Sequence, residues 1–141
     1  MFGRSVFRER GGRDKHTHVW GRAGQDVVVE ALFGVDEVDG ILDYRHIDTA
    51  QSYFNESEVG DGIKASGIDR KELFVTTKVW LEHYGYEQTL KSVEVSLKKL
   101  KTDYLDLLLL LHRPYSDVHG SWRALEKLYR DGVVRAIGVS N

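Results

Sequence analysis

Cysteine is absent from the 141 residues of this sequence. Its absence excludes a disulfide framework, a thiolate metal site and a cysteine nucleophile. An excess of charge of one sign is also lacking, because the formal net charge is only −2. This balance gives no indication of binding to nucleic acid or to an anionic membrane. The longest apolar run, Leu107 to Leu111, is far shorter than the roughly 20 residues of a membrane span. These absences favour a soluble, cytoplasmic enzyme or binding domain.

The start of the chain shows no sustained periodicity up to about residue 42. Residues 1–16 are rich in arginine and glycine, and we expect them to be disordered or irregular. No apolar signal core follows this basic start, so secretion is not indicated. Residues 17–141 are expected to form one domain.

From Tyr44 onward, strands and helices alternate. Strands are predicted at 44–48, 73–79, 104–111 and 134–139 from their β-branched, aromatic and leucine-rich runs. Their starts lie about 30 residues apart, which is the period of the strand–helix unit of a parallel sheet.

Three helices are predicted between these strands. Asn55 and Glu58 fit a capping box at the start of the first helix, and Gly67 fits its end. The second helix covers 86–101, where apolar residues recur at steps of three and four and predict one buried face. Those residues are Tyr86, Leu90, Val93, Leu97 and Leu100. The third helix ends at Gly132.

A doubly wound sheet and a (β/α)8 barrel both satisfy this alternation. Asp48, Lys78 and His112 stand at the carboxyl ends of three successive predicted strands. In a barrel those ends converge on one face, where barrel enzymes keep their active sites. No G-x-G-x-x-G turn follows a predicted strand, which weighs against a Rossmann site. The sequence therefore predicts an α/β fold of the (β/α)8 TIM-barrel type.

Asp48, Tyr53, Lys78 and His112 together suit the reduction of a carbonyl group. A phenol has a pKa of about 10 and donates its proton poorly near neutral pH unless a cation stabilises the phenolate. Lys78 can supply that cation, Asp48 can hold the ammonium group in place, and Tyr53 can then protonate a carbonyl oxygen. His112 can hydrogen-bond the same oxygen. Since no side chain donates hydride, a nicotinamide cofactor is implied.

Four stretches, in this order, resemble the aldo-keto reductase family: YRHIDTAQSYFNESEVG, LFVTTKVW, DYLDLLLLLHRP and RAIGVSN. Two helical stretches, GYEQTLKSVEVSLKKL and SWRALEKLYRDG, are most similar to its prokaryotic branch, which includes the diketogulonate reductases. The resemblance covers roughly residues 43–141. It implies NADPH-dependent reduction of small aldehydes or ketones to alcohols, by a family whose full-length members are often monomers.

The resemblance also implies roles for individual residues. The four residues above would form the catalytic tetrad, with Tyr53 as the proton donor. Ser140 and Asn141 would hydrogen-bond the carboxamide of the nicotinamide. Trp80 would line the substrate pocket together with His112, and no metal is expected.

Two features depart from the family pattern. The sequence ends at GVSN, where the family's fifth barrel strand ends, so we expect the first five strands of such an enzyme and weak or absent binding of NADPH phosphates. Five leucines separate Asp106 from His112, where the family usually has four residues. One extra residue turns a strand side chain to the opposite face. We expect a shift in register, with no bulge in Leu107–Leu111, that keeps His112 facing the catalytic centre and turns Asp106 to the other face.

Two other interpretations stay open. The chain could be a non-catalytic, truncated remnant that keeps the motifs but does not bind cofactor. It could also be a metal-dependent barrel hydrolase, because His46 and Asp48 are two residues apart and share one face of a strand, with Lys78 and His112 nearby. Tyr53 has no role in such a hydrolase.

Overall fold

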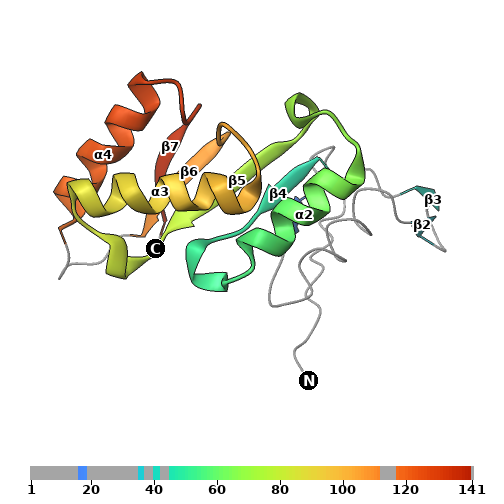
Figure 1. Cartoon of the computed structure of the whole chain (residues 1–141), viewed down its shortest axis with the longest axis horizontal. Coiled ribbons are helices and arrows are strands. Elements are labelled where there is room, and N and C mark those ends of the chain that lie inside the picture. The colour runs from blue at the N-terminus through green and yellow to red at the C-terminus, as the bar shows by residue number, and fades with distance from the viewer. Residues whose placement is uncertain (1–15, 19–34, 37–39, 42–44, 112–116, 141) are drawn as a thin grey trace.

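A computed structural model describes residues 16–18, 35–36, 40–41, 45–111 and 117–140 of the chain. Five strands form a parallel sheet in the order β1-β4-β5-β6-β7 (Figure 1). Their bounds are His16–His18 (β1), His46–Asp48 (β4), Phe74–Val79 (β5), Leu107–Leu111 (β6) and Ile137–Ser140 (β7). The predicted order and parallel pairing of the last four strands are confirmed.

The bounds of some strands differ from the prediction. β6 and β7 start later than expected, and Leu105 and Val134 form only an isolated parallel bridge. β1 begins at His16, the last residue of the segment predicted to be disordered, and pairs with β4. Residues 1–15 lie outside the described part of the chain. A short antiparallel pair, β2 (Val35–Asp36) and β3 (Gly40–Ile41), was not predicted.

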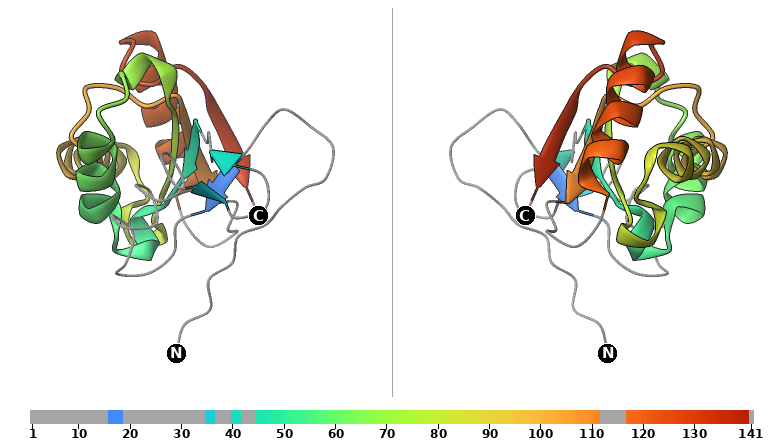
Figure 2. Two further views of the ribbon diagram at one scale, coloured as in Figure 1. Left: turned by 90° about the vertical axis from the view of Figure 1, so that its right-hand side faces the viewer. Right: turned by 90° about the vertical axis from the view of Figure 1, so that its left-hand side faces the viewer.

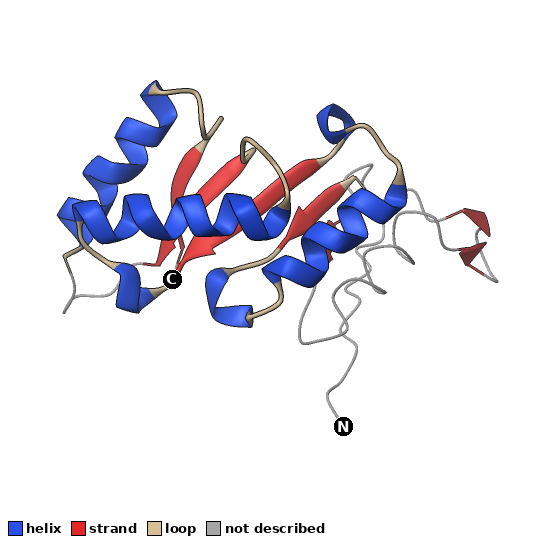
Figure 3. Cartoon of the chain, in the orientation of Figure 1, coloured by secondary structure: helices blue, strands red, loops and turns tan. Residues whose placement is uncertain are grey.

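Three α-helices follow β4, β5 and β6 along the chain: α2 (Glu56–Ser66), α3 (Tyr86–Leu100) and α4 (Val118–Arg130). Figure 2 shows these helices on one side of the sheet, and Figure 3 shows α2 and α3 lying over the strands. A doubly wound sheet carries helices on both faces, so this part of the chain has the arrangement of a barrel wall. No helix in the described ranges is long and apolar enough to cross a membrane.

The sheet buries the side that faces the helices. Its residues there include Ile47, Val75, Val79, Leu108 and Leu110, each at most 1% exposed. They belong to one core with apolar side chains of the helices, among them Val59, Ile63, Val93, Leu100, Leu125 and Leu128. Because side chains alternate along a strand, Asp48 and Lys78 lie on the other side of the sheet.

The five leucines of β6 pair without interruption. Leu107 to Leu110 pair with Thr76 to Val79 of β5, and Leu108 to Leu111 pair with Ile137 to Ser140 of β7. The strand therefore contains no bulge, as predicted for this run. The predicted facing of His112 concerns a residue outside the described part of the chain.

The ends of α2 agree only partly with the prediction. Gly67 has a φ of 66° and ends the helix as expected. Asn55 precedes the helix, but its side chain makes no capping hydrogen bond. It accepts a hydrogen bond from Thr49 Oγ1 at 2.9 Å instead. The predicted capping box is therefore wrong, because a buried threonine hydroxyl competes for the asparagine oxygen.

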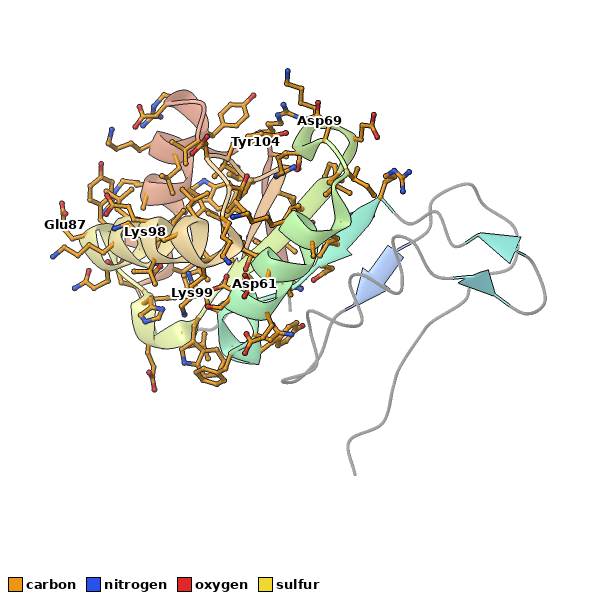
Figure 4. The ribbon with its side chains drawn as sticks, turned by 45° about the vertical axis from the view of Figure 1, so that its right-hand side comes forward. Asp61, Asp69, Glu87, Lys98, Lys99 and Tyr104 are labelled. Carbon is orange, nitrogen blue, oxygen red and sulfur yellow. The ribbon has the colours of Figure 1, made fainter. Side chains whose placement is uncertain are left out.

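The most buried face of α3 also differs from the predicted apolar stripe. Leu90 and Leu97 are only partly buried and pack at the margin of the core. The outer surface carries charged side chains, including Glu87, Lys98 and Lys99 (Figure 4). The buried residues of α3 are Thr89, Ser92, Val93, Ser96 and Leu100.

Helices α2 and α3 approach each other closely at Gly60. A Cβ atom at this position would collide with the carbonyl oxygen of Lys99 and would lie 2.8 Å from the carbonyl carbon of Leu100. Both neighbours are backbone atoms, which cannot turn away as a side chain can. The contact between the two helices therefore requires glycine at this position.

An ionic cluster joins segments near the amino ends of β5, β6 and β7. Asp106 is 3% exposed and accepts a hydrogen bond from the backbone N–H of Val75 at 2.9 Å. Its carboxylate pairs with Arg70 at 2.8 Å and with Arg135 at 3.1 Å. The two guanidinium carbons lie 4.1 and 4.2 Å from the ring centroid of Tyr104.

Candidate active site

The stretch after β4 forms a tight turn that carries Tyr53. The backbone N–H of Thr49 donates to Thr76 O at 2.9 Å, so pairing with β5 extends just past Asp48. The short 3-10 helix η1 (Gln51–Tyr53) follows, and Tyr53 N donates to Ala50 O at 3.1 Å. Tyr53 is thereby held beyond the carboxyl end of β4, as expected from the sequence.

Lys78 joins Asp48 to Tyr53 at this end of the sheet. Its Nζ atom forms an ion pair with Asp48 Oδ1 and donates to Thr49 O at 3.2 Å. The same atom lies 5.3 Å from the ring centroid of Tyr53. The Lys78 and Asp48 side chains are 14% and 18% exposed, so solvent screens their attraction only in part. Asp48 and Lys78 lie within ion-pair reach, as predicted, whereas Tyr53 meets Lys78 through its ring; the catalytic role of the three residues stays a prediction.

The other predicted site residues are placed less completely. Trp80 directly follows β5 and precedes the 3-10 helix η3 (Leu81–His83), and its side chain is partly buried. Ser140 ends β7 and pairs with Leu111 at the carboxyl edge of the sheet. His112 and Asn141 lie outside the described residues.

A buried polar network behind this turn was missed by the sequence analysis. Glu56 is 2% exposed and accepts hydrogen bonds from Thr77 Oγ1 at 2.8 Å and from Ser96 Oγ at 3.2 Å. Burial raises the pKa of the Glu56 carboxyl above its ordinary value of 4.5, although these two hydrogen bonds and the Lys99 ammonium group, 3.9 Å away, lower it. Thr77 directly precedes Lys78, but its side chain faces the helices, so the network lies on the opposite side of β5 from the ion pair.

One sequence signal could have revealed this network. Thr89, Ser92 and Ser96 are spaced by three and four residues, so small polar side chains form their own stripe on α3. A polar stripe beside an apolar one indicates buried hydrogen-bonding partners on another element. The partners of the two serines, Gln51 and Glu56, precede Ser96 by 45 and 40 residues and cannot be identified from local pattern.

The geometry weighs against a metal-dependent hydrolase. Asp48 would have to bind the metal, but it pairs with the Lys78 ammonium group, whose charge repels a metal ion. The His46 ring packs edge-on against Phe74, with ring centroids 4.5 Å apart. Within the described ranges, no three His, Cys, Asp or Glu side chains gather as a metal-binding group.

Comparison with known sequences identifies the family. The sequence profile of the Aldo/keto reductase family matches residues 41–141. This chain belongs to the aldo/keto reductase family. The resemblance noted in the sequence motifs is therefore confirmed, over the part of the chain that carries Asp48, Tyr53 and Lys78.

Known aldo/keto reductases resemble this chain in sequence and in structure. The glyoxal reductase of Bacillus subtilis (strain 168) is 61% identical over 99 residues, which cover 70% of this chain and 36% of that protein. The crystal structure of an aldo/keto reductase from Brucella melitensis matches with a TM-score of 0.77 and 43% identity, over 89% of this chain and 48% of that one. A Bombyx mori aldo-keto reductase in complex with NADP matches with a TM-score of 0.68 and 32% identity, over 88% of this chain and 45% of that one.

These matches define the fold. The parallel sheet with its helices is part of the (β/α)8 barrel of the aldo/keto reductases, as predicted. The chain spans between about a third and a half of the length of the reductases it matches.

Proposed function

We propose that this site reduces the carbonyl group of small aldehydes or ketones to an alcohol, with NADPH as the reductant. The observation that supports this most directly is the position of the Lys78 ammonium group. It pairs with Asp48 and lies beside the Tyr53 ring, where a fixed cation favours transfer of the phenolic proton. The glyoxal reductase at 61% identity points to small, reactive aldehydes as the substrate class.

Each residue has a defined part in the reaction. A bound nicotinamide would supply the hydride that the carbonyl carbon receives. The electron pair of the C=O bond moves to the oxygen, which takes the proton from Tyr53 Oη. Lys78 stabilises the phenolate that remains, Asp48 holds the ammonium group in place, and solvent returns the proton to Tyr53.

The proposed binding residues fit a nicotinamide cofactor and a carbonyl substrate. Ser140 lies at the carboxyl edge of the sheet, the edge that also carries Lys78, and its hydroxyl can donate to or accept from a carboxamide. Asn141 would add a second hydrogen bond to this group. His112 would orient the carbonyl oxygen, and Trp80 would form a wall of the pocket.

The test places this site in a complete barrel. Residues 41–141 replace the matching segment of the Bacillus subtilis glyoxal reductase, and glyoxal-dependent loss of NADPH absorbance is measured. We expect the chimera to reduce glyoxal and Tyr53→Phe to lower kcat by about 100-fold or more, the usual contribution of a general acid.

Tyr129→Phe is the matched control, because this phenol lies on the exposed surface of α4. It should leave kcat unchanged. A chimera that folds by circular dichroism but does not consume NADPH would refute the proposal. A Tyr53→Phe chimera with the same kcat as the parent chimera would also refute the proposal.

A further inference from the structure

The side chain of Gln51 connects three elements around the candidate site. Gln51 begins the turn that carries Tyr53 and is 7% exposed. Its Oε1 atom lies 2.8 Å from Trp80 N and 2.9 Å from His83 Nδ1, both in the segment after β5. Its Nε2 atom lies 3.2 Å from Ser92 Oγ and 3.0 Å from Ser96 Oγ on α3.

The partners fix the orientation of this amide. The backbone N–H of Trp80 can only donate, so the oxygen of Gln51 must face it. His83 Nδ1 must then also carry a hydrogen and donate to the same oxygen. On the other side, Ser92 Oγ donates to Thr89 O at 2.9 Å. The lone pairs of its oxygen are thus available to the amide N–H of Gln51.

Ser96 completes the hydrogen bonding of Gln51. Its hydroxyl donates to Glu56 Oε2 at 3.2 Å, and its oxygen accepts the second N–H of Gln51. The buried amide therefore uses both of its hydrogens and both lone pairs of its oxygen. A fully satisfied buried group of this kind rigidifies the elements that it joins.

We propose that Gln51 is a positioning residue, which fixes the Tyr53 turn relative to the Trp80 segment. This role rests on the function proposed above, in which Tyr53 gives the proton and Trp80 lines the substrate pocket. Gln51 belongs to the turn of Tyr53 and holds the backbone of Trp80 directly. Proton donor and pocket wall thus keep one mutual geometry, on which the rate of proton transfer depends.

Amide hydrogen exchange of the full 141-residue chain tests this connection. Gln51→Leu removes all four hydrogen bonds at a similar side-chain volume. We expect the Trp80 amide to exchange about tenfold faster or more, as loss of one buried hydrogen bond implies, together with the amides of Tyr53 and Phe54.

Ser121→Ala is the matched control. Ser121 is fully buried and bonds to Gly85 N at 2.9 Å and Thr89 Oγ1 at 3.1 Å, away from the Tyr53 turn. It should destabilise the chain without a selective effect on the Trp80 amide. If Trp80 exchange is no faster in Gln51→Leu than in Ser121→Ala, the proposed connection is wrong.

Kinetics of the glyoxal reductase chimera separate positioning from folding. Gln51→Leu should lower kcat by about tenfold to 100-fold, the cost of a small misplacement, with the affinity for NADPH unchanged. Ser121→Ala should change neither kcat nor the affinity for NADPH. Faster Trp80 exchange with normal kcat would overturn the positioning role and leave the proposed function intact. A parent chimera without reductase activity would overturn the proposed function, and the positioning role with it.

Discussion

Phe54, the residue after Tyr53, has a backbone conformation that side chains rarely adopt. Its φ is 54° and its ψ 27°, in the left-handed region, and its side chain is 79% exposed. This conformation costs a residue with a Cβ atom about 1–2 kcal/mol. Because the Phe54 ring is so exposed, its packing offsets little of this cost. The candidate site thus includes a strained residue next to its proposed proton donor, as is common at active sites.

Phe54→Gly should therefore stabilise the protein. Glycine adopts this φ without strain, although it adds entropy to the unfolded chain, so the free energy of unfolding should rise by about 0.5–1 kcal/mol. Urea denaturation measures the change. Phe54→Ala keeps a Cβ atom at the same φ and should give no such gain, whereas equal gains for both variants would exclude backbone strain as the cause.

Glu56 gives a second prediction, on pH dependence. Burial raises the pKa of its carboxyl in the folded protein above the ordinary 4.5, so the folded state binds its proton more tightly than the unfolded chain does. The stability from this group is fully present below about pH 4.5 and is lost as pH rises through the raised pKa.

Glu56→Gln removes this titration. The free energy of unfolding of the wild type, minus that of the variant, should fall as the pH rises upward from about 4.5. Urea denaturation across a pH series measures both values. A difference that stays constant, or grows with pH, would contradict the raised pKa.

At the scale of elements, α3 shows what local sequence does and does not reveal. Its bounds followed from the apolar steps between Tyr86 and Leu100. Its most buried face could not be predicted in the same way, because Ser92 and Ser96 are buried with hydrogen bonds to Gln51. Hydrophobic periodicity identifies the apolar face that a helix buries away from water. The two serines are polar and are buried because they hydrogen-bond to a residue that is distant in sequence.

The contact between α2 and α3 depends on Gly60. Gly60→Ala places a methyl group against the backbone of Lys99 and Leu100. The helices must move apart, so we expect a loss of about 1–3 kcal/mol in the free energy of unfolding, measured in urea.

Gly67→Ala separates steric overlap from backbone strain. Gly67 has a φ of 66° and no atom within 4 Å of an added Cβ, so its substitution should cost only about 1 kcal/mol. A Gly60→Ala variant that is as stable as the wild type would show that the two helices can separate freely.

At the scale of the whole molecule, the two edges of the sheet carry different chemistry. The carboxyl edge carries Lys78 and Asp48, while the amino edge carries Asp106 between Arg70 and Arg135. In barrel enzymes the first edge is catalytic and the second serves stability. The regular spacing of strands predicted this division only in part, because the arginine partners of Asp106 lie outside the strands. Arg70 begins a short 3-10 helix before β5, and Arg135 lies in the bend before β7.

Asp106→Asn should therefore destabilise the molecule without affecting the candidate site. It leaves Arg70 without its buried carboxylate, which typically costs about 3 kcal/mol or more. Urea denaturation measures the loss, and amide exchange at Trp80 should change no more than global stability does. Asp61→Asn, which breaks the exposed pair with Lys101, should have no measurable effect. Equal stability of both variants would argue against a structural role for the Asp106 cluster.

Some features of the whole fold had no local signal. β1 is three residues long and pairs with β4, a partner some 30 residues away in the sequence. The β2–β3 pair spans two residues on each side, too few for a recognisable alternation. Three strand–helix units and a fourth strand were predictable because one pattern repeats over some 30 residues. Single pairings that depend on tertiary contact were not.

The run of five leucines in β6 has one further consequence. In a strand made of identical side chains, a slide of one residue exchanges the leucines that face the helices with those that face the other side. The composition of the run therefore does not specify which leucines face the helices. That information must come from its flank. Asp106, held by the N–H of Val75 and by two arginines, marks where the strand begins. The alignment of β6 is thus set by the charged residue before it, because the five leucines alone do not distinguish one register from the next.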